Sequence, residues 1–426
     1  MTVLVFITAL LGAMALGMPI AFALIACGVA LMMYLGMFDT QIIAQNLING
    51  ADSFPLMAVP FFMLAGTVMN AGGLSKRIIN VAMTLVGHIK GGLGYVTIVA
   101  ATILASLSGS AAADAAAMSA LLFPMMIKSG YEPKSSAGLI AAGSIIGPMV
   151  PPSANIILFG VISGLSITKL FLAAIFPGLL IAAGLVVAWW WVARKQTMSV
   201  RPRASMKERL VALKDGAWAL GMPGILVFGL KFGIFTPTEA GVVCCVYAMF
   251  VAIFVYKELK WSQVYDVLAQ AGQMAAIVMF LVAAALVSAW LITIAEIPQQ
   301  VVEMLRPFMG SKIMLMAMIM VLTVIIGTAL DMTPTILILT PVLVPVVVAA
   351  GIDPIYFGVL FIINNAIGLV TPPVGTTLNV TCGVTKVSMD DIIIGVWPFM
   401  IAQLVILALL VIFPELVLVP LKFLMP

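Results

Sequence analysis

The stretch Gly327-Thr328-Ala329-Leu330-Asp331-Met332-Thr333-Pro334 lies in the middle of an apolar run from Ile313 to Ala350, in which Asp331 is the only charged residue. An unbroken helix over this run would be roughly 57 Å long at about 1.5 Å per residue. The hydrocarbon core of a membrane is only about 30 Å thick. The run is therefore expected to turn back at its Gly- and Pro-containing middle and form a hairpin. Because an ionisable side chain is costly inside a membrane, Asp331 is a candidate functional residue.

The composition places this hairpin in a membrane protein. Of the 426 residues, 64% are hydrophobic and 8% are charged, whereas soluble domains contain about 25% charged residues. No segment shows the alternation of apolar and polar residues that is typical of a β-barrel. The sequence therefore predicts an all-α polytopic membrane protein. The chain has a single histidine, His88, which leaves little room for a His-rich metal site or a Ser-His-Asp triad.

The basic residues are concentrated in one loop. Seven of the 20 lie between Arg194 and Lys214, and a short basic loop between apolar segments is typically cytoplasmic. A nucleic-acid-binding role is disfavoured, since no soluble domain is available to hold this patch. The apolar N-terminal segment has no preceding basic region, and the first basic residue is Lys76. It is therefore expected to be a membrane span rather than a cleaved signal peptide.

A second apolar run, from Gly91 to Ile127, resembles the first and has Asp114 as its only charge. Its middle contains small residues, from Ser106 to Asp114, which let helix backbones approach closely. Two further apolar runs are interrupted by proline pairs, at Pro151-Pro152 and at Pro372-Pro373. Broken helices of this kind are tolerated at membrane depth where they line a cavity or are buried in protein.

These features recur in the same order in residues 54–192 and 274–418. Each half has an apolar run, an amphipathic segment, a hairpin with one central Asp, a Pro-Pro-broken run and a final span. Four prolines keep a constant offset of 221 residues: Pro124, Pro133, Pro152 and Pro177 correspond to Pro345, Pro354, Pro373 and Pro398. Asp114 and Asp331 differ by 217, so the second half has four more residues between its Asp and the following loop. Paired Gly- and Pro-interrupted segments of this kind indicate a transporter site built from discontinuous helices.

The repeat divides the chain into five parts. We expect residues 3–36 to form one long span that is kinked or broken, 39–53 to be interfacial or loop, and 261–270 to be an interfacial segment separate from a span at 274–294. The parts are an N-terminal scaffold span with its interfacial segment (1–53), repeat 1 (54–193), the basic cytoplasmic loop (194–216), scaffold spans (217–273) and repeat 2 (274–426).

Four motifs resemble those of one family, the large membrane subunit of tripartite ATP-independent periplasmic (TRAP) transporters. The motifs are Ser108–Asp114, Gly147–Ser153, Gly327–Asp331 and Thr371–Gly375. The resemblance covers essentially the whole chain. It implies an inverted-repeat, elevator-type secondary transporter of the bacterial inner membrane with two re-entrant hairpins and two broken helices. The amphipathic segments 75–90 and 296–312 would be arms that join the moving and static parts.

The resemblance also implies function and partners. Na⁺ flow would drive uptake of a carboxylate solute, which could be a C4-dicarboxylate, a sialic-acid-type sugar acid or a 2-oxo acid. A periplasmic binding protein would deliver the solute, and a small membrane subunit, expected as a separate chain, would complete the transporter. No cofactor other than the coupling ion Na⁺ is expected. Asp331 slightly favours a polyhydroxylated acid.

Within this framework, the hairpin tips and the breaks are the expected binding elements. Carbonyl and hydroxyl oxygens suit a hard cation, and helix N-termini suit a carboxylate. Solute contacts are expected from Ser110, Ser153 and Asp331, and Asp114 is a supporting candidate that could instead cap its helix. Sodium contacts are expected from Ser106, Ser108, Gly147, Val150 and Pro151 in the first half, and from Gly327, Gly368, Thr371 and Val374 in the second.

Three other interpretations remain open from the sequence. The protein could be an ion-coupled carboxylate transporter that works without a binding protein. A membrane-embedded enzyme is disfavoured, because no metal-ligand set, nucleophile-base pair or phosphate-binding loop appears. A structural subunit would leave the two central Asp residues and the paired breaks as unexplained costs.

Overall fold

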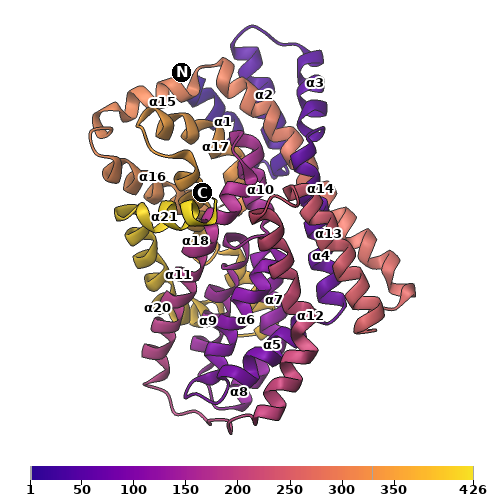
Figure 1. Cartoon of the computed structure of the whole chain (residues 1–426). Coiled ribbons are helices and arrows are strands. Elements are labelled where there is room, and N and C mark those ends of the chain that lie inside the picture. Colours follow the sequence, from indigo (N-terminus) through magenta and orange to yellow (C-terminus); the bar gives the residue numbers. More distant parts are fainter. Residues whose placement is uncertain (1, 329, 426) are drawn as a thin grey trace.

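The computed structural model describes residues 2–328 and 330–425, without the side chains of 106–108, and is helical throughout the described part (Figure 1). Among these residues, eight helices are long and apolar enough to cross a membrane, and a bent helix pair would be a ninth. The prediction of an all-α polytopic membrane protein is confirmed. The loop between α11 (Ile167–Ala193) and α12 (Met206–Lys231) lies at the lower end in Figure 1. It is shorter than the expected basic loop of residues 194–216, because Lys207, Arg209 and Lys214 already belong to α12.

The N-terminal region differs from the expectation. Instead of one long kinked or broken span, α1 (Thr2–Ala15) and α2 (Ile20–Tyr34) are separate helices that pack against each other. Gly17, with a φ of +80°, allows the chain to reverse before Pro19 begins the second helix. The expected interfacial loop is also a helix, α3 (Thr40–Ala51), whose first turn is capped by Asp39 accepting from the Gln41 N–H at 2.7 Å.

The first half of the repeat begins with η1 (Phe54–Met57) and α4 (Ala58–Ala71), followed by the amphipathic helix α5 (Leu74–Val86). The hairpin consists of α6 (Gly92–Ser108), α7 (Ala111–Leu121) and α8 (Phe123–Lys128). The broken helix follows as α9 (Pro133–Ser144), η2 (Gly147–Met149) and α10 (Ala154–Ser163), with a bend of 42°. Its proline pair, Pro151-Pro152, has a cis peptide bond.

The connecting scaffold contains α12, α13 (Pro237–Phe250) with its π-helical extension η3 (Val251–Val255), and α14 (Trp261–Ile294). The expected separation of 261–270 from 274–294 is wrong, because α14 is one continuous helix of 34 residues. Its interior lacks proline, and Gly272, its only glycine, does not interrupt it. The expected boundary between residues 273 and 274 therefore lies inside a helix.

The second half repeats the order of elements. After α14 come the amphipathic helix α15 (Ile297–Leu305) with η4 (Arg306–Phe308), and then the hairpin helices α16 (Lys312–Gly327) and α17 (Met332–Ala349). The broken helix is α18 (Pro354–Gly368) and α19 (Thr376–Thr385), again with a cis bond in its proline pair, Pro372-Pro373. The chain ends with α20 (Met389–Ile412) and α21 (Glu415–Leu424).

The two halves interlock in the core. Helix α9 packs on α20, α10 packs on α17, and α19 packs on α7, so each broken helix contacts elements of the other half. The rings of Phe159, Phe357 and Phe361 meet at centroid distances of 5.4–6.3 Å and are fully buried. This cross-packing holds the two hairpins close to each other.

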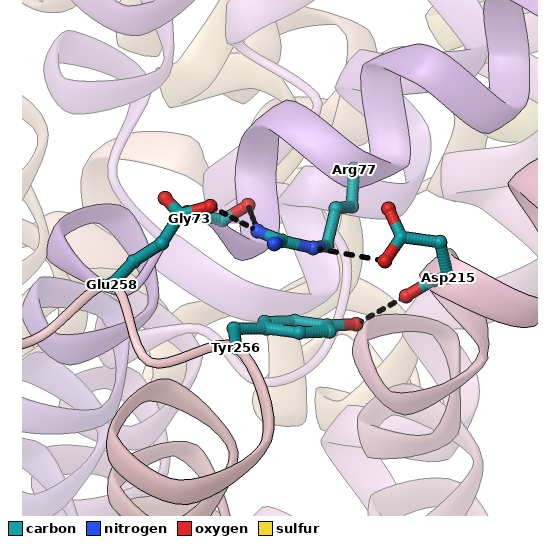
Figure 2. Close-up of polar contacts among 5 residues, drawn as sticks. All are labelled: Gly73, Arg77, Asp215, Tyr256 and Glu258. Atoms are coloured by element: carbon teal, nitrogen blue, oxygen red, sulfur yellow. Dashed lines mark hydrogen bonds and ion pairs between the residues drawn. The ribbon is translucent and has the colours of Figure 1, made fainter.

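The amphipathic helix α5 is fastened to the scaffold by Arg77 (Figure 2). Its guanidinium donates to Glu258 at 2.7 Å, to Asp215 at 3.4 Å and to the Gly73 carbonyl at 3.1 Å. It also lies over the Tyr256 ring, 3.7 Å from the centroid, and the Tyr256 hydroxyl donates to the Asp215 carbonyl. One planar cation thus joins α5, α12 and the segment after η3.

Candidate functional site

The first hairpin tip lies directly against the first break. Helix α6 ends at Gly109, which has a φ of +58°. A Cβ atom at this position would lie 2.8 Å from the carbonyl oxygen of Pro152. Only glycine fits both the left-handed backbone and the close approach. The next residue, Ser110, caps α7 by accepting from the Ala113 N–H at 3.4 Å.

Asp114 lies behind this tip, in the first turn of α7, where a carboxylate is favoured by the helix N-terminus. Its side chain is only 3% exposed. A Cβ atom on Gly147 would lie 2.5 Å from Asp114 Oδ2, so the carboxylate is packed against the backbone of the break. The structure therefore brings together Asp114 and Gly147, two of the residues selected from the sequence.

The second tip meets the second break at a close backbone contact between two glycines. A Cβ atom on Gly368 would lie 2.9 Å from the Cα atom of Gly327. Asn365 lies beside this contact, since a Cβ on Gly327 would be 4.0 Å from its Oδ1. Asn365 is 1% exposed, and its Nδ2 donates to the Phe361 carbonyl at 2.9 Å. Among the described residues, its Oδ1 has no hydrogen-bond partner.

A cavity of about 560 Å³ connects the two tips. Its lining comes from both hairpins, both broken helices, α4 and α14. Ser110 and Asp331 both line it, at the tips of the first and second hairpins. None of the described lining residues is Lys, Arg or His.

Polar contacts cross this cavity between separate elements. The Thr376 hydroxyl, at the start of α19, donates to Asp331 Oδ1 at 3.5 Å. The Thr333 hydroxyl, at the start of α17, donates to Asn155 Oδ1 on α10 at 3.3 Å. The second contact joins the two halves of the repeat at the cavity wall.

Four helices begin at the cavity. Its lining includes the N-terminal residues of α7 (Ala111–Ala113), α10 (Ala154 and Asn155), α17 (Met332 and Thr333) and α19 (Thr376). A helix N-terminus presents unpaired N–H groups and a partial positive charge, and both attract anions. The cavity therefore has a positive electrostatic contribution that does not depend on basic side chains.

Residues 7–416 match the family model described as "Tripartite ATP-independent periplasmic transporter, DctM component". The chain belongs to this family of TRAP large permeases. It is 54% identical, over 99% of this chain and 100% of the relative, to the 2,3-diketo-L-gulonate TRAP transporter large permease protein YiaN of Escherichia coli. It is 37% identical, over 95% of each chain, to the sialic acid TRAP transporter large permease protein SiaM of Vibrio cholerae.

The fold of the permease is also found in a solved structure. The YdaH transporter of Alcanivorax borkumensis matches with a TM-score of 0.63 and 15% identity, covering 90% of the permease and 89% of that chain. Family membership makes the permease a multi-pass protein of the bacterial inner membrane and a component of a tripartite transporter, not an enzyme.

Several residues selected from the sequence lie outside the cavity lining of the permease. Ser153 is fully buried, where its hydroxyl donates to the Pro148 carbonyl at 2.7 Å and caps α10. Thr371 donates to the Ile367 carbonyl at 2.8 Å, and the Val374 carbonyl accepts from Asn379 at 2.7 Å. The side chains of Ser106 and Ser108 lie outside the described residues. Val150 and Pro151 belong to the first break, where the Val150 side chain is directed at Gly178. Asp114, Gly147, Gly327 and Gly368 also lie outside the lining, at the contacts between tips and breaks.

Four polar residues at the tips and breaks of the permease were not selected from the sequence: Asn155, Thr333, Asn365 and Thr376. Asn365 could have been selected from the sequence, since Asn364-Asn365 interrupts the otherwise apolar run of α18. Asn155 and Thr376 could also have been selected, because each follows a proline pair by three residues.

Proposed function

We propose that the permease uses a Na⁺ gradient to drive the uptake of a carboxylate solute, and that the solute binds in the cavity between the two tips. The observation that supports this proposal is the convergence of four helix N-termini on one polar cavity. Fixed backbone dipoles stabilise an anion without a basic side chain. An anion could therefore bind although the described cavity lining contains no Lys or Arg.

The solute class that fits best is a hydroxylated or oxidised sugar acid. The carboxylate would lie near the helix N-termini, and the rest of the molecule would contact Ser110, Asn155 and Asp331. Asp331 repels an anion but accepts hydrogen bonds from hydroxyl groups, so it favours a polyhydroxylated solute over a compact dicarboxylate. The relative that is 54% identical is named for 2,3-diketo-L-gulonate, an acid of this class.

Sodium would bind beside each tip, outside the solute cavity. In the first half, Asp114 provides a buried anionic oxygen next to Gly147, and the carbonyls of Val150 and Pro151 at the break would be further ligands. In the second half, the candidate ligands are Asn365 Oδ1, the Gly327 carbonyl and Thr371, with Gly368 and Val374 completing the break. Hard oxygen ligands of this kind suit Na⁺, by the same reasoning as for other hard cations. The side chains of Ser106 and Ser108 remain proposed ligands of the first site.

The movement would be that of an elevator. The hairpins and broken helices, which interlock through α7, α10, α17 and α19, would move as one unit against the scaffold that includes α12 to α14. Helices α5 and α15 would act as arms between the two. The solute would be delivered by a periplasmic binding protein, and a small membrane subunit would complete the scaffold.

The experiment that tests this function is uptake of 2,3-diketo-L-gulonate into proteoliposomes that contain the permease and the small subunit. Purified binding protein is added outside, and either a Na⁺ gradient or a pH gradient is imposed. We expect uptake with the Na⁺ gradient only. Uptake that follows the pH gradient and ignores Na⁺ would disprove the coupling ion. Equal uptake without the binding protein would favour the transporter type that needs no delivery protein.

A further inference from the structure

A second cavity, of about 910 Å³, lies between α5 and the beginning of α12, away from the transport cavity. On the α12 side it is lined by Arg201, Arg203 and Lys207, and on the α5 side by Asn80 and Thr84. Arg201 and Arg203 lie in the loop before α12 and Lys207 lies in its first turn. The positive-inside rule places this basic segment on the cytoplasmic side. The transport function assigns no role to this cavity.

The cavity has excess positive charge. Among the described residues, none of its three cations forms an ion pair. Its one acidic lining residue, Glu208, is already bound, since Glu208 Oε2 accepts from the Ser205 N–H at 2.6 Å in the capping box of α12. The N-terminus of a 26-residue helix adds further positive potential.

Apolar side chains flank the cations on the exposed surface. Met206, Leu210 and Val211 at the start of α12 are 60–70% exposed, and Leu85 and Ile89 on the α5 side are 40% and 44% exposed. A ligand that contacts both groups has a phosphate at one end and hydrocarbon at the other. We propose that this cavity binds the headgroup of an anionic phospholipid from the cytoplasmic leaflet, with its acyl chains along the apolar flank.

The position of the site gives the lipid a mechanical role. Arg77 joins α5 to Asp215, farther along α12 from the cavity (Figure 2). The headgroup would link the same two helices at the other end of their contact, where Thr84 of α5 and Lys207 of α12 line the cavity. Helices α5 and α12 already pack directly on each other, and the lipid would add a further link between the arm and the scaffold at this end of their contact.

The test measures lipid-dependent thermal stabilisation of the purified full-length permease in detergent. Phosphatidylglycerol is titrated against phosphatidylcholine with the same acyl chains, and inorganic phosphate is titrated separately. The test variant is Arg201→Gln, Arg203→Gln and Lys207→Gln together. The matched control is Arg194→Gln, Lys195→Gln and Lys214→Gln, which removes the same charge from the same basic segment but from residues that do not line the cavity.

We expect phosphatidylglycerol to stabilise the wild type and the control equally, and its apparent affinity to fall about tenfold or more in the test variant. If the test variant is unstable without lipid, Lys207→Gln alone is used, and a reduced affinity is still expected. An equal loss of phosphatidylglycerol affinity in the control variant would show a general effect of charge and would overturn the proposed site. Equal stabilisation by phosphatidylcholine, or by inorganic phosphate at the same concentration, would overturn the assignment to an anionic lipid.

Discussion

The carboxylate of Asp114 is packed against Gly147, so that the hairpin and the broken helix of the first half meet at a residue without a side chain. Substituting Gly147 by Ala would place a Cβ atom 2.5 Å from Asp114 Oδ2. The clash requires Asp114 or the break to move.

We expect Gly147→Ala to lower Na⁺-driven uptake strongly and to destabilise the permease by about 1–3 kcal/mol, the usual cost of overpacking. Gly224→Ala is the matched control, because no atom lies within 4 Å of a Cβ at that helical position. Uptake in proteoliposomes and thermal unfolding measure the two effects. Normal uptake by Gly147→Ala would contradict a close fit at this contact.

Asp331 is the residue at which direct contact with the solute can be tested. Because its carboxylate lines the cavity and accepts from Thr376, we expect Asp331→Asn to reduce uptake by about tenfold or more, in line with one lost charged hydrogen bond. Asp353→Asn makes the same chemical change at the cap of α18, outside the cavity, where Asn caps as well as Asp. Normal uptake by Asp331→Asn or Asp331→Ala would remove Asp331 from the site.

Asn365 tests the proposed second sodium site. We expect Asn365→Ala to raise the Na⁺ concentration for half-maximal uptake about tenfold, while uptake at saturating Na⁺ and solute is largely retained. Asn46→Ala is the control, since Asn46 and Asn365 each donate to the carbonyl four residues earlier in their helices. An unchanged Na⁺ dependence in Asn365→Ala would show that its Oδ1 is not a sodium ligand.

The attachment of α5 to the scaffold depends on Arg77. Arg77→Met removes the donors to Glu258, Asp215 and Gly73 together, and we expect it to destabilise the permease by about 1–2 kcal/mol. Arg77→Lys should restore only part of this, because an ammonium cannot reproduce the planar geometry of a guanidinium over Tyr256. Lys76→Met is the neighbouring control, and thermal unfolding is the measurement. Equal loss of stability in both Met variants would show that the Arg77 contacts are not responsible.

The sequence predicted the helical membrane fold and located the tips and breaks, because glycine, proline and charge are conspicuous in apolar runs. It could not establish which Asp faces the cavity. The internal repeat paired Asp114 with Asp331, but in the structure Asp331 occupies the N-cap position of α17, as Ser110 does for α7, and only Ser110 accepts a capping hydrogen bond. The offset between Ser110 and Asp331 is the same 221 residues as for the prolines. The counterpart of Asp114 is Thr335, which is fully buried and donates to the Asp331 carbonyl.

Other features of the site depend on contacts between residues far apart in the chain. The pairing of Thr333 with Asn155 joins residues 178 positions apart. The continuity of α14 was missed because a polar segment at its start resembles the amphipathic arms, whereas tertiary packing on α2, α3 and α4 keeps it helical. Local patterns do not contain this information.

The convergence of helix N-termini has a consequence for how such permeases diversify. In the proposed site, the attraction for a carboxylate would come from the peptide groups of four helices, which exchanges of the lining side chains leave in place. Exchanges at Asn155, Thr333 or Thr376 can therefore change the preferred solute while affinity for an acid is preserved. Relatives named for 2,3-diketo-L-gulonate and for sialic acid, at 54% and 37% identity, are consistent with one anion-binding backbone that is adapted by its side chains.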